Sequence, residues 1–420
     1  MYTHYQVLIV GGGTAGIMLA AKLRREKRHL PIAVIEPSKD HWYQPAWTLV
    51  GAGTYNYPDT RRDEASVIPA GVTWLQEKAT EVLPEENTVR TEKSGDFTYD
   101  YLVLAPGSKY DLDGIEGLRE ALSKPNVCSN YIDPRKTWST LLNFKGGNAV
   151  FTQAASQLKC GGAPQKIMYL ADDYFRKTGV RDKSNILFAT PGSTIFGVPE
   201  FLATLQEVVK RKEIIVRTFY SPVKIDSQRN EVHFKLLQPH KQPFTANERL
   251  LERMEGAETV VIPYAMLHLA PPHVAPDIVR NSPALAVAEG PHKGWLDVDP
   301  HTLQHKRYPN IYGLGDIAAL PTGKTGAAVR KQAPVVAANL LARLHQRQQP
   351  EKQYQGYSSC PVITGYGKMV LAEFKYDNIR DSDPLISRFV DTTKEQWSMW
   401  LLKKYGLPWM YWNLMLKGIM

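Results

Sequence analysis

Cysteine is scarce in this chain, which has only Cys128, Cys160 and Cys360 in 420 residues. Three cysteines cannot form a disulfide framework, and no Cys-x-x-Cys pair or histidine cluster indicates a metal site. A cysteine pair that matters in so large a chain is therefore expected to be chemical rather than structural. Cys160 and Cys360 lie in segments shaped by glycine and proline, whereas Cys128 has no such setting and is left out of the predicted site.

Long apolar runs are also missing. No stretch of roughly 18 or more apolar residues occurs, so no membrane-spanning helix is predicted. An apolar strand is expected to begin by residue 5, which leaves no room for a signal peptide. The net charge is +9, but no basic run with interleaved aromatic residues is typical of a nucleic-acid reader. The charge therefore favours a membrane surface or small anions as partners.

The N-terminal segment carries a dinucleotide fingerprint in its full context. An apolar strand runs into Gly11-x-Gly13-x-x-Gly16, and a helix over 17–25 and a strand over 32–35 follow before Glu36. The glycines allow a tight turn and the close approach of a pyrophosphate to the helix N-terminus. Glu36 is placed to hold a ribose hydroxyl. The segment predicts a dinucleotide site.

A second motif indicates which dinucleotide binds. The apolar strand at 311–314 ends in Gly315 and Asp316, and an earlier strand ends in Ala105-Pro106-Gly107. Combined with the fingerprint, these strand ends predict the segment that grips the ribityl chain of FAD. Lys324 precedes a long helix expected over 326–348, and it is predicted to place a cation near the flavin.

The second α/β block lacks the glycine fingerprint that a second dinucleotide would need. Neither the strand at 148–152 nor the strand at 185–190 is followed by Gly-x-Gly-x-x-Gly, so NAD(P)H is not the expected electron donor. Cys160 occupies the corresponding place, just ahead of a helix expected over 167–177. The helix N-terminus and Lys159 or Lys166 would favour its thiolate form.

The predicted fold is α/β, with two Rossmann-like doubly wound domains and a C-terminal membrane-associating module. The expected domains are 1–120 plus 295–355 for FAD, 121–294 for the second Rossmann-like unit, and 356–420 for the module. Residues 395–420 are rich in Trp, Leu and Met, with Lys403, Lys404 and Lys417 as polar ends. A break at Gly406-Leu-Pro408 predicts two short amphipathic helices lying in the headgroup region, with a dimer interface as the alternative.

Four segments resemble the sulfide:quinone oxidoreductase family, in particular the branch of the mitochondrial enzyme: 41–53, 159–170, 302–309 and 359–366. The likeness extends over essentially the whole chain. It implies a glutathione-reductase-like fold, bound FAD and monotopic membrane association, with Cys160 and Cys360 as the redox pair. The predicted cofactor-binding set is Gly11, Gly13, Thr14, Ala15, Gly16, Glu36, Gln44, Ala79, Ala105, Gly107, Gly315, Asp316 and Lys324.

The reaction expected from this resemblance is oxidation of hydrogen sulfide to sulfane sulfur, a persulfide or polysulfide, with two electrons passing through FAD to a membrane quinone. The alternatives are a type II NADH:quinone oxidoreductase, disfavoured by the missing second fingerprint, and the flavoprotein subunit of a sulfide-oxidising complex. The early first strand leads us to expect the bacterial cytoplasmic membrane, with a processed form at the mitochondrial inner membrane as the alternative. The sulfur acceptor and a homo-oligomeric state are left open.

Overall fold

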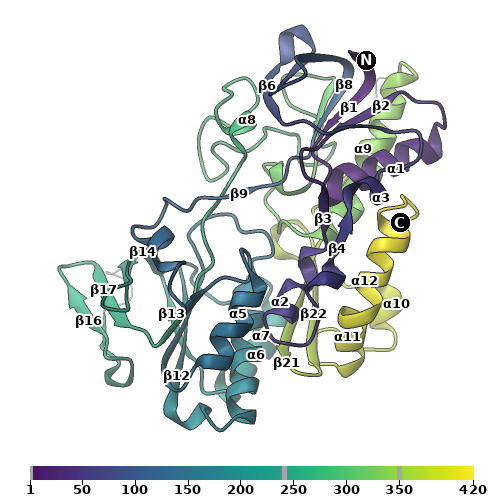
Figure 1. The fold of residues 1–420 in the computed structure, drawn as a ribbon. Helices are drawn as coiled ribbons and strands as arrows, with labels where there is room; N and C mark the ends of the chain where they lie inside the picture. The colour runs from purple at the N-terminus through teal and green to yellow at the C-terminus, as the bar shows by residue number, and fades with distance from the viewer. Residues whose placement is uncertain (1–2, 239–243, 348–351) are drawn as a thin grey trace.

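The chain folds into two α/β lobes, one built around a mixed sheet with parallel central strands and the other around a parallel sheet, and a C-terminal segment runs alongside both (Figure 1). The computed structural model describes residues 3–238, 244–347 and 352–420. In Figure 1 the lobe with β1, β2 and β8 lies at the top, and the lobe with β12 and β13 lies at the bottom. The C-terminal helices, in yellow, lie on the right. This architecture matches the predicted α/β fold of two doubly wound units.

The first sheet contains the N-terminal strand. Its strands follow the order β5-β2-β1-β8-β7-β6, and β20 pairs in parallel with the end of β8. The strands are β1 (His4–Val10), β2 (Ile32–Ile35), β5 (Thr73–Leu75), β6 (Ala79–Leu83), β7 (Thr88–Thr91), β8 (Asp96–Leu104) and β20 (Ile311–Gly313). β2 and the second half of β1 are buried on both faces, which explains their continuous apolar sequences. α1 (Thr14–Glu26) and α9 (Gly326–Leu344) pack against each other beside this sheet.

The second sheet is parallel throughout. Its order is β10-β18-β11-β12-β13, from β10 (Val127–Cys128), β18 (Met266–His268), β11 (Gly147–Thr152), β12 (Ser184–Thr190) and β13 (Ile215–Thr218). Its helices are α5 (Pro134–Asn143), α6 (Ala163–Lys177) and α7 (Pro199–Arg211). An antiparallel sheet extends this lobe, with β14 (Tyr220–Asp226), β15 (Glu231–Leu236), β17 (Thr259–Pro263) and β16 (Arg253–Glu255). Between the lobes, β9 (Lys109–Tyr110) pairs with β19 (His273–Val274). The exact domain boundaries stay a prediction.

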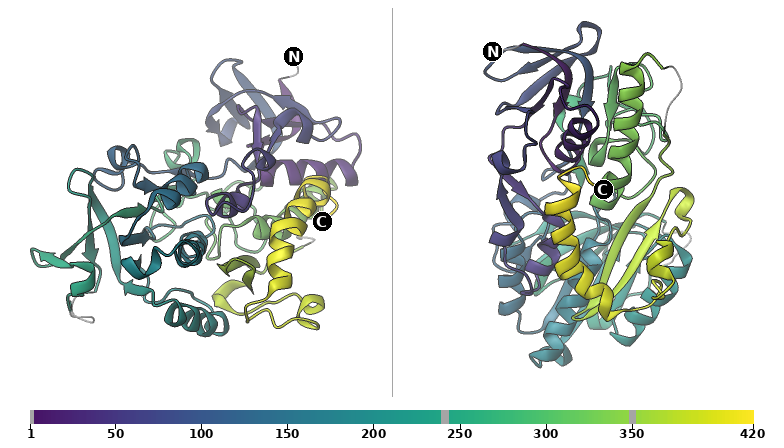
Figure 2. Two further views of the ribbon diagram at one scale, coloured as in Figure 1. Left: turned by 60° about the horizontal axis from the view of Figure 1, so that its bottom comes forward. Right: turned by 90° about the vertical axis from the view of Figure 1, so that its right-hand side faces the viewer.

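The C-terminal region starts with the antiparallel hairpin of β21 (Ser358–Gly365) and β22 (Lys368–Phe374). The short helix α10 (Pro384–Ser387) follows, and a longer helical segment then runs from this hairpin towards α1 (Figure 2). Among the described residues, no helix has both the length and the apolar character that crossing a membrane would require.

The longer helical segment corrects one prediction. α11 (Trp397–Leu401), Leu402–Gly406, α12 (Leu407–Met410) and Tyr411–Met415 follow one another directly, so the expected break at Gly406-Leu-Pro408 is wrong. Leu402–Gly406 and Tyr411–Met415 are wider π-helical turns. A proline ring clashes with the carbonyl four residues earlier in a regular α-helix, and the wide turn that precedes Pro408 relieves that clash.

Candidate active site

The fingerprint glycines bring the end of β1 against two other segments of the first lobe. Gly11 has φ +107°, and a Cβ there would lie closer than 3.0 Å to the backbone of Ala105. The Gly12 N–H donates a 2.8 Å hydrogen bond to Glu36 Oε2. At Gly13, by contrast, a Cβ would meet no atom of the described residues within 4 Å. The structure therefore brings Gly11, Glu36 and Ala105 together around an open approach to the start of α1, which fits a bound pyrophosphate.

Gly315, just past the end of β20, also lies against the start of α1. Gly315 has φ +78°, and a Cβ on it would lie 3.0 Å from the Cβ of Ala15 in the first turn of α1. Asp316 follows, and its carbonyl accepts a 2.6 Å hydrogen bond from Lys324 Nζ. The Lys324 ammonium also lies 4.0 Å from the centre of the Trp295 ring. Burial lowers the pKa of Lys324 to about 7, and the charge of Asp316 opposes that shift.

Two predicted cofactor residues have other surroundings. Gln44 Oε1 accepts a 2.7 Å hydrogen bond from Lys159, whose ammonium also lies 4.9 Å from the centre of the Tyr110 ring. The structure therefore shows Lys159 engaged with Gln44 and Tyr110, and Lys166 as the lysine that contacts the cysteines. Ala79 opens β6, which β7 and β8 separate from β1 in the strand order. Its role in binding stays a prediction.

The fold brings together two cysteines that are 200 positions apart (360 − 160). Cys160 lies just before α6 with φ +51°, and its N–H donates a 2.8 Å hydrogen bond to the carbonyl of Lys324. Cys360 is buried in the middle of β21, and its thiol is hydrogen-bonded to Cys160. Both are free thiols. Gly162 makes this approach feasible, because a Cβ there would lie closer than 3.0 Å to Cys360 Sγ.

Two lysines are buried beside the thiols. Lys166 Nζ lies 3.0 Å from Cys160 Sγ, and Lys403 Nζ donates a 2.9 Å hydrogen bond to the carbonyl of Pro45. Burial and the nearby charge of Lys166 lower the pKa of Lys403 to about 7. Lys403 was predicted to be a polar end of the amphipathic tail. It is 4% exposed instead, because its helix packs across the cysteine site.

The two thiols have different acidities. The hydrogen bond from Cys360 holds the pKa of Cys160 well below its usual range, against the effect of burial, and the charges of Lys166 and Lys403 help. The same hydrogen bond, together with burial, raises the pKa of Cys360. Burial alone would lower the pKa of Lys166, but the charges of Cys160 and Cys360 raise it, so it stays an ammonium. The site therefore pairs a Cys160 thiolate with a Cys360 thiol.

Cys128 is separate from this pair. It lies in β10 with no exposed surface, and burial raises the pKa of its thiol to about 12. A thiol with that pKa is inert as a nucleophile near neutral pH.

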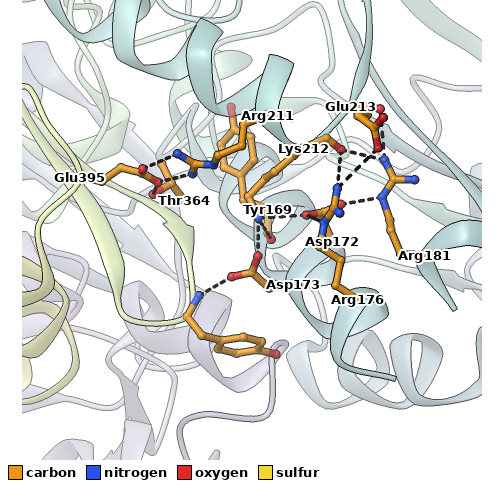
Figure 3. Close-up of polar contacts among 11 residues, drawn as sticks. Tyr169, Asp172, Asp173, Arg176, Arg181, Arg211, Lys212, Glu213, Thr364 and Glu395 are labelled. Carbon is orange, nitrogen blue, oxygen red and sulfur yellow. Dashed lines mark hydrogen bonds and ion pairs between the residues drawn. The ribbon is translucent and has the colours of Figure 1, made fainter. Parts of the chain in front are cut away.

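Polar contacts fasten α6, which follows Cys160, to β21, which carries Cys360 (Figure 3). Asp173 on α6 accepts a 2.8 Å hydrogen bond from the N–H of Tyr366, just past β21, and pairs with Lys212. Beside it, the fully buried Asp172 accepts hydrogen bonds from Arg181 at 2.7 Å and from Lys212 at 3.0 Å. A buried carboxylate is stable when it is paired in this way. The Asp173–Tyr366 hydrogen bond therefore ties α6, which follows Cys160, to the end of the strand that carries Cys360.

Several features of this site could not be predicted from the sequence. Gly162 could have been recognised from the Cys-Gly-Gly triplet, in which one glycine allows close approach. Lys403 gave no usable signal, because a lysine in an amphipathic helix normally faces solvent. His41, Glu64 and Tyr411 form a buried hydrogen-bonded chain next to the fingerprint, and only the fold brings them together.

Comparison with known proteins places this geometry in a family. Residues 5–145 match the model of the pyridine nucleotide-disulphide oxidoreductase family. The chain is 42% identical to mitochondrial sulfide:quinone oxidoreductase of the mouse, Mus musculus, over 99% of this chain and 87% of that protein. It is 38% identical to the mitochondrial protein of the same name from Dictyostelium discoideum, over 98% of this chain and 86% of that protein.

A solved structure has a similar fold. The sulfide:quinone oxidoreductase of the bacterium Aquifex aeolicus superposes with a TM-score of 0.76 at 21% identity, covering 99% of this chain and 92% of that chain. These relationships imply a flavin cofactor. They favour the main functional prediction over a type II NADH:quinone oxidoreductase. The expectation of a bacterial membrane gains no support, because the relatives named above at 38% and 42% identity are mitochondrial.

The mouse relative exceeds 30% identity over nearly the whole chain, and the fold agrees with a solved member of the same group. The chain therefore belongs to the sulfide:quinone oxidoreductase family.

Proposed function

We propose that this protein oxidises hydrogen sulfide to sulfane sulfur at Cys160 and Cys360 and passes two electrons through FAD to a quinone. The observation that carries the proposal is the contact of a Cys160 thiolate with the Cys360 thiol and the Lys166 ammonium. An acidic thiol beside a second thiol is the arrangement that thiol–disulfide exchange uses.

The cofactor site supports FAD through the residues described above. Gly11, Gly13 and Gly16 would admit the pyrophosphate to the start of α1, and Glu36 would hold a ribose hydroxyl. Asp316 would lie near the ribityl chain of FAD, and Lys324 would lie near its flavin ring. Bound there, FAD supplies a two-electron acceptor for the cysteine site and a two-electron donor for quinone.

The position of Lys166 beside Cys160 gives the reaction a direction. In the oxidised state Cys160 and Cys360 form a disulfide, and hydrosulfide attacks one sulfur while the other leaves as a thiolate. The thiolate with a cation beside it is the better leaving group, so Cys160 leaves and Cys360 becomes a persulfide that keeps the proton of hydrosulfide. Lys166 stabilises the departing Cys160 thiolate across 3.0 Å.

The cycle then closes on the same residues. A nucleophilic acceptor takes the outer sulfur of the Cys360 persulfide and leaves a Cys360 thiolate. Re-forming the bond between the Cys160 and Cys360 sulfurs releases the two electrons that sulfide brought in, and these are the electrons that reach quinone. Below about pH 7, Lys403 adds a second positive charge beside the site, which favours an anionic substrate such as hydrosulfide.

The C-terminal region supports a peripheral position on a membrane. Its exposed apolar side chains include Phe389, Trp397, Trp409 and Ile419, which are 81%, 65%, 59% and 52% exposed. Exposed apolar side chains of this size are typical of interaction surfaces, and Trp with nearby lysines suits the headgroup region. A membrane surface would also supply a lipid-soluble quinone. The mitochondrial relatives support a mitochondrial setting.

The test uses the flavin-loaded protein with Cys160→Ser or Cys360→Ser. Each variant should keep its flavin, because neither side chain belongs to the predicted cofactor set, but sulfide should no longer reduce it. Anaerobic absorbance spectroscopy after sulfide addition measures both properties. Flavin reduction by sulfide at the wild-type rate in Cys160→Ser would refute the proposed chemistry.

A further inference from the structure

A buried chain of hydrogen bonds joins the C-terminal helix to the fingerprint. The Tyr411 hydroxyl lies 2.6 Å from His41 Nε2 and 2.8 Å from Thr14 Oγ1. His41 Nδ1 lies 3.1 Å from Glu64 Oε2. His41, Glu64 and Tyr411 are 3%, 1% and 4% exposed. The chain therefore connects the helix end to Thr14, the half-buried first residue of α1, through three buried side chains.

One assignment of protons satisfies every bond in this chain. The Thr14 hydroxyl donates to Tyr411, the Tyr411 hydroxyl donates to His41 Nε2, and His41 Nδ1–H donates to Glu64 Oε2. The other carboxylate oxygen, Glu64 Oε1, has no hydrogen-bond partner among the described residues. A buried carboxylate oxygen without a donor is costly, so this atom calls for a donor that the protein itself does not provide.

Glu64 Oε1 faces the dinucleotide site. A Cβ on Gly12 would lie 2.5 Å from this oxygen and 2.7 Å from the Cβ of Glu36. Glu36 accepts its hydrogen bond from the Gly12 N–H, so the two carboxylates flank the same glycine. Burial raises the pKa of Glu36, and the charge of Glu64 adds to the shift. Hydroxyl groups of a ribose are donors of the kind that two neighbouring carboxylates would bind.

The end of the C-terminal helix packs on α1, as both views in Figure 2 show. Gly418 has φ +67°, and a Cβ there would lie 2.6 Å from the backbone nitrogen of Lys22. Leu416 is 1% exposed within the core of the first lobe. The Tyr411 ring lies 4.6 Å from that of Tyr43, measured between ring centres. Residues 411–418 are therefore docked onto the lobe that carries the fingerprint.

We propose that Glu64 is a second acidic ligand for a ribose hydroxyl of the dinucleotide, and that Tyr411 latches the C-terminal helix to this ligand. A hydroxyl bound to Glu64 Oε1 fixes the carboxylate that orients His41, and His41 in turn orients Tyr411. Helix docking and dinucleotide retention then strengthen each other, because coupling between two binding events is reciprocal. The inference rests on the FAD cofactor of the proposed function.

The first test measures how fast FAD leaves the purified holoprotein after dilution into flavin-free buffer, through the recovery of flavin fluorescence. Tyr411→Phe keeps the ring and removes the hydroxyl, and Glu64→Gln replaces one acceptor oxygen with a donor. Each should release FAD about three- to tenfold faster, the range that one net hydrogen bond provides. Tyr405→Phe is the matched control, because Tyr405 lies on the same helix and is 61% exposed. It should release FAD at the wild-type rate.

The second test uses the wild-type protein alone, so it holds even if a variant fails to fold. Hydrogen exchange of the amides at 411–418 should be slower in the FAD-loaded protein than after flavin removal. A purely structural role for Tyr411 would leave this exchange unchanged by FAD. The inference would be overturned if Tyr411→Phe or Glu64→Gln released FAD at the wild-type rate. It would also be overturned if amide hydrogen exchange at 411–418 were the same with and without FAD. A wild-type protein that never binds FAD would instead contradict the proposed function.

Discussion

Gly162→Ala is predicted to separate the two cysteines. The added Cβ would lie closer than 3.0 Å to Cys360 Sγ, where ordinary contact begins at 3.4 Å. The neighbours must therefore yield by up to about 1 Å, and overpacking of this kind costs about 1–3 kcal/mol. If Cys360 moves, its hydrogen bond to Cys160 is lost, and displacements of about 1 Å at a reacting centre cost on the order of 100-fold in rate. We expect sulfide-driven flavin reduction to fall at least tenfold, roughly 1.4 kcal/mol in the barrier.

The neighbouring glycine provides the control. At Gly161 the nearest atom to an added Cβ is Gln153 Nε2 at 3.9 Å, an ordinary contact, so Gly161→Ala should keep the wild-type rate. Anaerobic rapid mixing with sulfide gives the rate, and iodoacetamide labelling reports the reactivity of Cys160, which should decrease in Gly162→Ala. Equal rates and equal labelling in the two variants would refute the argument that close approach to Cys360 requires a glycine.

Three further predictions concern the surroundings of the pair. Lys403→Met should raise the pKa of Cys160 and so slow the labelling of Cys160 below pH 7. The difference in labelling rate from the wild type should vanish as pH rises through about 7, because native Lys403 loses its charge there, and a pH-independent difference would contradict this. Asp173→Leu should slow sulfide oxidation about tenfold, because the Tyr366 N–H loses its hydrogen-bond acceptor. Asp173→Asn keeps an acceptor for that N–H and should retain most of the rate, and equal losses of turnover in the two variants would argue against a role for this hydrogen bond. Trp409→Asp should weaken sedimentation with phospholipid vesicles several-fold while sulfide still reduces the flavin in solution, and unchanged sedimentation would exclude this face as the membrane contact.

The sequence was informative wherever local chemistry determines local structure. The glycines at 11, 13 and 16 and the acid at 36 have fixed spacing because a turn and a helix N-terminus need them, so the fold class could be predicted and is confirmed. Cys160 was notable because it stands where a second fingerprint would be expected. Its contact with Cys360 was implied only by resemblance, since nothing in the intervening 200 positions encodes it locally.

The parts that could not be predicted depend on packing between distant segments. Lys403 is buried because its helix crosses the cysteine site, and a helical pattern cannot reveal which neighbour covers a lysine. The continuous helix through Pro408 needs a π-helical turn, for which the sequence carries no recognised signal. The chain of Glu64, His41 and Tyr411 joins residues up to 370 positions apart, and only the folded lobe brings them together.

Sulfide, acting through the cysteine pair, is expected to reduce the flavin. The most direct measurement is anaerobic stopped-flow absorbance of the flavin-loaded protein mixed separately with sulfide and with NADH. Sulfide should cause rapid loss of the oxidised flavin band, and NADH should cause no change. Bleaching by NADH with no response to sulfide would contradict this expectation and would favour a dehydrogenase instead.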